Sequence, residues 1–80
     1  MDLLVLDGWR SGLNKVALTR ILCSRANISL AAAKHHVDEL LAGHTVTLPL
    51  ADTVTAEAIA REVSTVGAVA HVAEGSAHQR

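Results

Sequence analysis

The chain has 80 residues, which is enough for one domain, and a domain of this size buries only about 60% of the surface of its unfolded chain. Half of the residues are hydrophobic, but they include one tryptophan and no phenylalanine or tyrosine, so the core has to be built from small aliphatic side chains. The net charge of -1 and the scarcity of aromatic residues argue against direct nucleic-acid binding. The single cysteine excludes an internal disulfide and fits a reducing compartment. The apolar run near the start is too short for a signal or membrane segment, so we expect a soluble, cytoplasmic protein.

The predicted elements begin with a short strand. Residues 3–6 are apolar and are followed by Asp7-Gly8, a pair typical of turns. Residues 9–13 are then expected to form a loop that carries Trp9, the only aromatic residue. Trp9 lies beside an arginine, so it could cover the open end of the core or anchor a partner, because both residue types are enriched at binding hot spots.

Two helices are predicted next, with a tight corner between them. Asn14 is a good N-cap for a helix over residues 15–24, and Ser29 is a good N-cap for a second helix that Gly43 ends. Between the helices, Asn27 tolerates a left-handed backbone better than most residues. The aliphatic residues of both helices repeat at the spacing of a buried face. They are Leu18, Ile21, Leu22, Leu30, Ala33, Val37, Leu40 and Leu41.

A second strand and a third helix follow. Residues 44–50 alternate between polar and apolar, and Pro49 cannot donate a ladder hydrogen bond, so this strand is expected at an edge of the sheet. Thr53 or Thr55 is expected to cap the third helix. The apolar stripe of that helix consists of Ile59, Val63 and Val66.

The order of the elements defines the fold class. Residues 68–73 are expected to form the last strand and residues 74–80 a flexible tail, because the tail has nothing to bury. The order β-α-α-β-α-β indicates an α+β, two-layer sandwich over residues 1–73, with three helices on a small three-stranded sheet. One core is predicted to contain Leu18, Ile21, Leu22, Leu30, Ala33, Val37, Leu41, Ile59 and Val63.

The residues that could carry chemistry do not form a catalytic or metal-binding pattern. The five histidines suggest a metal site at first, because imidazole binds zinc, copper and nickel. However, His35 and His36 are adjacent on a helix and point about 100° apart, and the other three lie on two strands and in the tail. Cys23 lacks a residue that would orient a base, and no glycine-rich phosphate loop is present. We therefore expect a non-catalytic protein without a metal or cofactor.

Charge is distributed unevenly along the chain. Residues 1–34 contain five basic and two acidic side chains, a net charge of +3, whereas residues 35–80 contain two basic and six acidic side chains, a net charge of -4. Such an asymmetry favours an acidic partner that docks on the first half of the chain, although scattered solvated charges would give the same count.

Three patches of the sequence follow one another in a distinctive order. They are Asn14–Ala17, Asn27–Lys34, and Ala56–Ile59 leading to Val66–Val72. Their order and spacing resemble the C-terminal domain of the bacterial ribosomal stalk protein. The resemblance covers nearly the whole chain and implies a small β-α-α-β-α-β module that contacts translation GTPases and performs no chemistry. The N-terminal dimerisation segment and hinge of that family are absent, so we expect a stand-alone relative or an excised domain.

The resemblance also implies a contact surface. In the stalk family, basic residues on the first two helices contact the elongation and release GTPases, and the matching positions here include Lys15, Arg20 and Lys34. The family's surface isoleucine and arginine on the first helix are replaced by Thr19 and Cys23, and Cys23 is expected to be at least partly exposed. The expected residues for binding a translation GTPase or the ribosome are Lys15, Val16, Thr19, Arg20, Cys23, Leu30 and Lys34.

Two other classes of function stay open. The same fold occurs in the adaptor that delivers substrates to the ATP-dependent Clp protease, and residues 4–7 followed by a loop and a helix resemble its start. That family binds a substrate's N-terminal amine with an Asn-Asp-Asp run and a histidine near the end of its second helix. Here the matching positions hold Leu6-Asp7-Gly8 and Leu40. The third class is a self-associating regulatory protein, a homodimer through the edge strand at residues 45–50.

Overall fold

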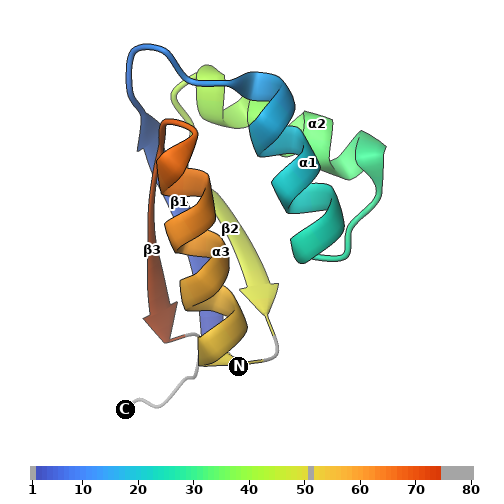
Figure 1. Cartoon of the computed structure of the whole chain (residues 1–80), viewed down its shortest axis with the longest axis vertical. Helices are drawn as coiled ribbons and strands as arrows, with labels where there is room; N and C mark the ends of the chain where they lie inside the picture. The colour runs from blue at the N-terminus through green and yellow to red at the C-terminus, as the bar shows by residue number, and fades with distance from the viewer. Residues whose placement is uncertain (1, 51, 75–80) are drawn as a thin grey trace.

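The computed structural model describes residues 2–50 and 52–74, and Figure 1 shows their arrangement. The elements are β1 (Asp2–Trp9), α1 (Lys15–Arg25), α2 (Leu30–Leu41), β2 (Val46–Leu50), α3 (Thr53–Thr65) and β3 (Ala68–Glu74). The strands form one antiparallel sheet in the order β2-β1-β3. The predicted α+β class and the β-α-α-β-α-β order are therefore confirmed. Among the helices described, none is long and apolar enough to cross a membrane.

The last strand extends one residue further than the sequence predicts. Glu74 was assigned to the tail, but its backbone pairs with Asp2 at the end of β3. Backbone pairing with β1 therefore continues past the last apolar residue of the strand. The rest of the predicted tail, residues 75–80, lies outside the described residues.

The first strand is also longer than predicted. Asp7-Gly8 does not form a turn, because β1 continues to Trp9 and its register with β3 shifts between Leu6 and Gly8. The shift is a β-bulge, which accommodates one extra residue without ending the ladder. Trp9 therefore ends a strand instead of lying in a loop. Trp9 is 45% exposed, so its surface is divided between solvent and the protein.

Local sequence signals set the ends of α1 and α2 as predicted. Asn14 Oδ1 accepts a hydrogen bond from the backbone N–H of Ala17, with a donor-acceptor distance of 3.1 Å. Ser29 Oγ accepts one from the backbone N–H of Ala32 at the same distance. Between the two helices, Asn27 has a left-handed backbone with a φ of 57°. The corner that joins the helices is therefore fixed by local hydrogen bonds and by one residue that tolerates positive φ.

The cap of α3 differs from the prediction. Asp52 is the N-cap, and its Oδ1 accepts a hydrogen bond from the backbone N–H of Thr55 at 2.7 Å. Thr53 is instead the first residue of α3, and its hydroxyl donates to the Asp2 carboxylate. The backbone and hydroxyl hydrogen bonds from Thr55 lower the pKa of the Asp52 carboxyl below its ordinary value. An ionised carboxylate at this position also interacts favourably with the positive end of the helix dipole, which explains why aspartate takes the place predicted for threonine.

The core is aliphatic, as the composition requires. The largest fully buried side chains are Leu4, Leu6, Leu18, Leu22, Leu40, Ile59 and Val63. Leu40 was left out of the predicted core, whereas Ile21 and Leu41 are only partly buried at its edge. Leu30, which was predicted to be in the core, is 53% exposed. It begins α2, and the first turn of α2 lies away from the sheet (Figure 1).

Gly67 closes the turn between α3 and β3 against the loop that follows β1. The backbone N–H of Arg10 donates to the Gly67 carbonyl at 2.7 Å. The φ of Gly67 is +107°, and a Cβ added there would lie 2.8 Å from Leu13 Cα. A side chain at this position would therefore meet both an unfavourable backbone conformation and a backbone clash.

Gly67→Ala is expected to lower the free energy of unfolding by about 1 to 3 kcal/mol or more, measured by urea denaturation. Gly12→Ala is the matched control, because Gly12 has a φ of +90° and nothing within 4 Å of an added Cβ. The control should carry the conformational cost alone and lose less stability. Equal losses in the two variants would show that the contact between the turn and Leu13 is not tight.

Candidate functional site: a groove between α1 and α2

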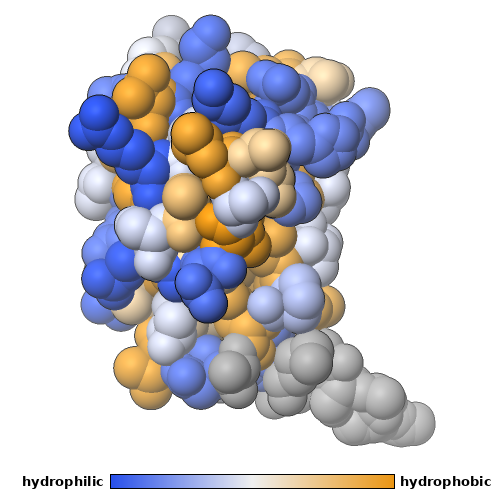
Figure 2. Space-filling view, turned by 90° about the vertical axis from the view of Figure 1, so that its right-hand side faces the viewer, coloured by the Kyte–Doolittle hydropathy of each residue, from blue (hydrophilic) through white to orange (hydrophobic). Residues whose placement is uncertain are grey.

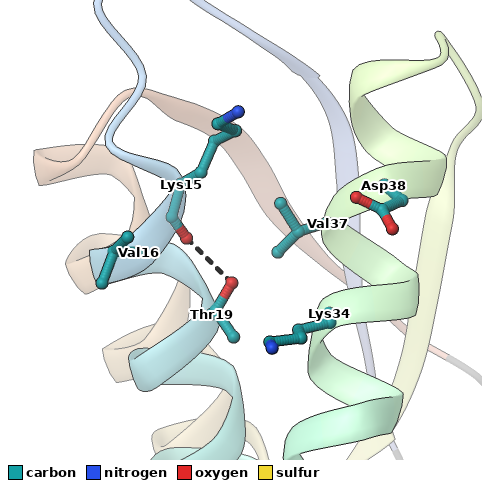
Figure 3. Close-up of a pocket in the computed structure, with 6 residues that line it drawn as sticks. All are labelled: Lys15, Val16, Thr19, Lys34, Val37 and Asp38. Carbon is teal, nitrogen blue, oxygen red and sulfur yellow. Dashed lines mark hydrogen bonds between the residues drawn. The ribbon is translucent and has the colours of Figure 1, made fainter.

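A shallow groove runs between the outer faces of α1 and α2 (Figure 3). Its volume is about 230 Å³. Four of the seven residues predicted to bind a partner line it, together with two residues of α2 that were not predicted. The lining consists of Lys15, Val16, Thr19, Lys34, Val37 and Asp38.

Both helices contribute side chains to the groove. On α1, the Thr19 hydroxyl donates to the Lys15 carbonyl at 2.8 Å, which turns the hydroxyl back onto the helix backbone. On α2, Val37 points toward α1 and is only 3% exposed, so it forms an apolar floor (Figure 3). Lys34 lies one turn before it and also points toward α1. The groove therefore combines an apolar floor with cationic groups from both helices.

The basic side chains of this surface are free to take an external partner. Among the side chains that the structure describes, no carboxylate lies within 4.0 Å of the charged groups of Lys15, Arg20 or Lys34. Arg25, at the end of α1, is engaged instead, because its Nε lies 3.5 Å from Glu62 Oε1 of α3. A basic group without an internal partner can form a charge-assisted hydrogen bond with a carboxylate of another protein.

Apolar side chains accompany these charges. Val16 is 64% exposed and Leu30 is 53% exposed. On the side of the molecule where α1 and α2 lie, Figure 2 shows an apolar area bordered by hydrophilic side chains. An apolar centre with a polar rim is the usual composition of a protein-protein contact. We refer to the predicted residues on α1 and α2, together with Val37 and Asp38, as the α1–α2 face.

Three predicted residues lie outside the groove itself. Arg20 is exposed on α1, Leu30 is exposed at the start of α2, and Cys23 is half-buried. The groove instead includes Val37, which the sequence analysis assigned to the core alone, and Asp38. The position of Asp38 could have been found from its spacing, because it follows Lys34 by one helical turn.

Cys23 is partly exposed, as predicted, and it also packs against the core. A thiol reagent is therefore expected to label Cys23 in the native protein, but more slowly than in the urea-unfolded chain. The rate of reaction with a chromogenic disulfide, measured with and without urea, checks this. Complete protection until unfolding would contradict the orientation of α1 on which the α1–α2 face depends.

The histidines that the structure describes do not gather into a metal-binding group. In the part of the chain that the structure describes, no three side chains of histidine, cysteine, aspartate or glutamate are placed to hold a metal ion. His44 Nδ1 lies 3.0 Å from Glu39 Oε1, and this contact lowers the pKa of Glu39. His71 Nδ1 lies 3.0 Å from Asp7 Oδ2. Two of the histidines thus have carboxylate neighbours rather than a shared ligand.

No family model matches the chain, and no curated protein matches it. Leu40, which the sequence analysis compares with the substrate-binding histidine of the Clp adaptor, is fully buried in the core. A side chain at this position does not line a surface pocket.

Proposed function

We propose that this chain is a non-catalytic protein-binding module of the kind found at the C-terminus of the ribosomal stalk protein. It binds an acidic protein partner through the α1–α2 face, and the candidate partner is a translation GTPase in the cytoplasm. One observation carries the proposal: the groove between α1 and α2 combines an apolar floor with two lysines that have no carboxylate partner among the described residues.

The geometry supports a specific mode of binding. Carboxylates of the partner would pair with Lys15 and Lys34 on either side of the groove, while an apolar side chain of the partner would cover Val37. Arg20, one turn further along α1 from Val16, would extend the basic surface beyond the groove. Charges at the rim of an interface mainly accelerate association, so added salt should slow binding more than it speeds dissociation.

The fold supports the same proposal. The order of elements is the one that the resemblance to the stalk domain implies, and the α1–α2 face lies on the side of the molecule away from β3 (Figure 1). The Clp adaptor shares this fold, so the order of elements does not separate the two proposals. The buried Leu40 favours the stalk-like mode over the adaptor mode.

A pull-down with the full chain from cells of its native host tests the proposal. The immobilised chain is expected to retain a translation GTPase, and the retained protein should elute as the salt concentration rises. Recovery of a Clp chaperone would support the adaptor instead. Recovery of the chain alone would reject both, and so would a partner that resists elution with salt.

A further inference from the structure

In the part of the chain that the structure describes, both edges of the sheet are free, and they differ in what they offer to another strand. β2 forms one edge, with five residues that include Pro49, which has no N–H to donate. β3 forms the other edge, with seven residues and no proline. Because β1 pairs with only one side of β3, every second residue of β3 directs its N–H and C=O away from the sheet. Such an edge is a template for pairing with another strand.

A groove follows this free edge on its helical side. It has a volume of about 550 Å³ and lies between α3 and β3. Its apolar residues are small: Ala60 on α3, and Ala70 and Val72 on β3. Glu57 and Arg61 stand one helical turn apart on α3, and neither has an oppositely charged group within 4.0 Å in the described ranges. The groove is thus lined by small apolar side chains and by one charged side chain of each sign.

We propose that β3 and α3 form a two-fold interface with a second copy of this chain. In this dimer β3 pairs antiparallel with β3 of the second copy, so that two three-stranded sheets become one six-stranded sheet. The α3 helices of the two copies then lie side by side over the junction. This inference goes beyond the proposed function and uses a different surface, since α1 and α2 lie on the other side of the molecule (Figure 1).

The register of the strands follows from symmetry. Directly opposed residues of an antiparallel pair point to the same face of a sheet. If the two-fold axis passes where one residue lies opposite its own copy, both α3 helices therefore lie on the same side of the joined sheet. An axis at His71, the centre of β3, pairs the full length of the strand. It places Ala70 opposite Val72 of the second copy on the helical face, and Val69 opposite Ala73 on the other face. None of these pairs brings like charges together.

His71 then lies opposite its own copy. In each chain its Nδ1 is 3.0 Å from Asp7 Oδ2, so the carboxylate offsets the charge of a protonated imidazole. Each of the two imidazoles at the centre of the joined sheet therefore has a carboxylate of its own chain beside it.

The position of α3 is compatible with the same arrangement. α3 packs on the sheet next to β3, the strand that forms the junction (Figure 1). Ala60 and Ser64 are small enough for the two α3 helices to approach each other closely.

The charges select a second copy as the occupant rather than an unrelated strand. A two-fold axis that passes between Glu57 and Arg61 places Glu57 of each chain opposite Arg61 of the other. The surface is therefore complementary to itself, as an isologous interface has to be. A single strand from an unrelated protein would not bring a second α3, so Glu57 and Arg61 would not meet the opposite charges that a second copy supplies.

Charge reversal tests the interface with the full chain. Sedimentation equilibrium is expected to show a monomer-dimer equilibrium for the natural sequence. Arg61→Glu and Glu57→Arg should each weaken the dimer by about tenfold or more, because each brings like charges together at two symmetric sites. An equimolar mixture of the two variants should form a heterodimer as tight as the natural homodimer, because unlike charges meet again. Arg20→Glu is the matched control and should leave the dimer unchanged.

Hydrogen exchange supplies a second readout. In the natural dimer, all backbone amides in the middle of β3 should exchange slowly. In the Arg61→Glu variant alone, every second amide should exchange rapidly, because the free edge is exposed again. A chain that stays monomeric at millimolar concentration would overturn the proposal. A dimer that persists in both variants, with no preference for the heterodimer in the mixture, would overturn it as well.

Discussion

Leu22→Ala is expected to lower the free energy of unfolding by about 2 to 5 kcal/mol. Leu22 is fully buried on α1, within the cluster that joins α1 to the sheet. Truncation removes apolar contacts and leaves a cavity that this small core can fill only in part. Since a domain of 80 residues has a total stability of roughly 4 to 12 kcal/mol, the variant should lose a large part of it.

Val16→Ala is the matched control for Leu22→Ala. Val16 is on the same helix but is 64% exposed, so its truncation should change the free energy of unfolding by about 0.5 kcal/mol at most. Urea denaturation of both variants gives the comparison. If the two changes had equal and small effects, α1 would not pack on the sheet in the way described, and the α1–α2 face would lose its support.

The triple variant Lys15→Glu, Arg20→Glu, Lys34→Glu is expected to abolish binding of the partner. Each change replaces a cation that has no carboxylate neighbour in the described structure by an anion that repels an acidic partner. All three side chains are exposed, so the fold should stay intact. The measurement is the dissociation constant for the retained GTPase, together with the circular dichroism spectrum of the variant.

A charge-preserving variant separates charge from damage to the surface. Lys15→Arg, Arg20→Lys, Lys34→Arg alters the same three side chains and keeps their charge. It should bind within about threefold of the natural chain, because point charges at the rim of an interface depend little on the exact cationic group. If the glutamate variant bound at normal strength, the interface would lie elsewhere, and the Trp9 end of β1 or the β2 edge would be the next surface to test.

Much of the fold follows from local signals in the sequence. Asn14 and Ser29 cap their helices as predicted, and Asn27 takes the left-handed backbone at the corner between them. Pro49 correctly places β2 at an edge. In each case one residue acts on its immediate neighbours, so the preference of that residue decides the outcome.

The predictions that were wrong concern positions where contacts between residues far apart in the sequence determine the structure. Asp7-Gly8 favours a turn locally, but pairing with β3 extends β1 through a bulge. Leu30 has the correct helical spacing for the core, but it starts α2 at a point where no sheet lies beneath it. These outcomes depend on where strands that are distant in the sequence begin and end. The spacing of apolar residues along one helix does not predict those positions.

The candidate site was predictable only in part for the same reason. Lys15, Val16, Thr19 and Lys34 were expected on one surface, and they line one groove. Val37 was assigned to the core, and it is nearly buried, yet it also forms the floor of that groove. Helical spacing assigns each residue to either the buried or the exposed face. A residue at the boundary of the core, such as Val37, can contact the core and also line the groove between two packed helices.

Amide chemical shifts of the ¹⁵N-labelled full chain, titrated with a purified translation elongation GTPase, test the central claim most directly. The largest changes are expected in residues 15–20 of α1 and 34–38 of α2, and they should diminish when salt is added. The amides of β3 should change little, because β3 lies on the other side of the molecule. Changes confined to β3 and α3, or no changes with the GTPase in excess, would contradict the assignment of the α1–α2 face as the surface that binds this partner.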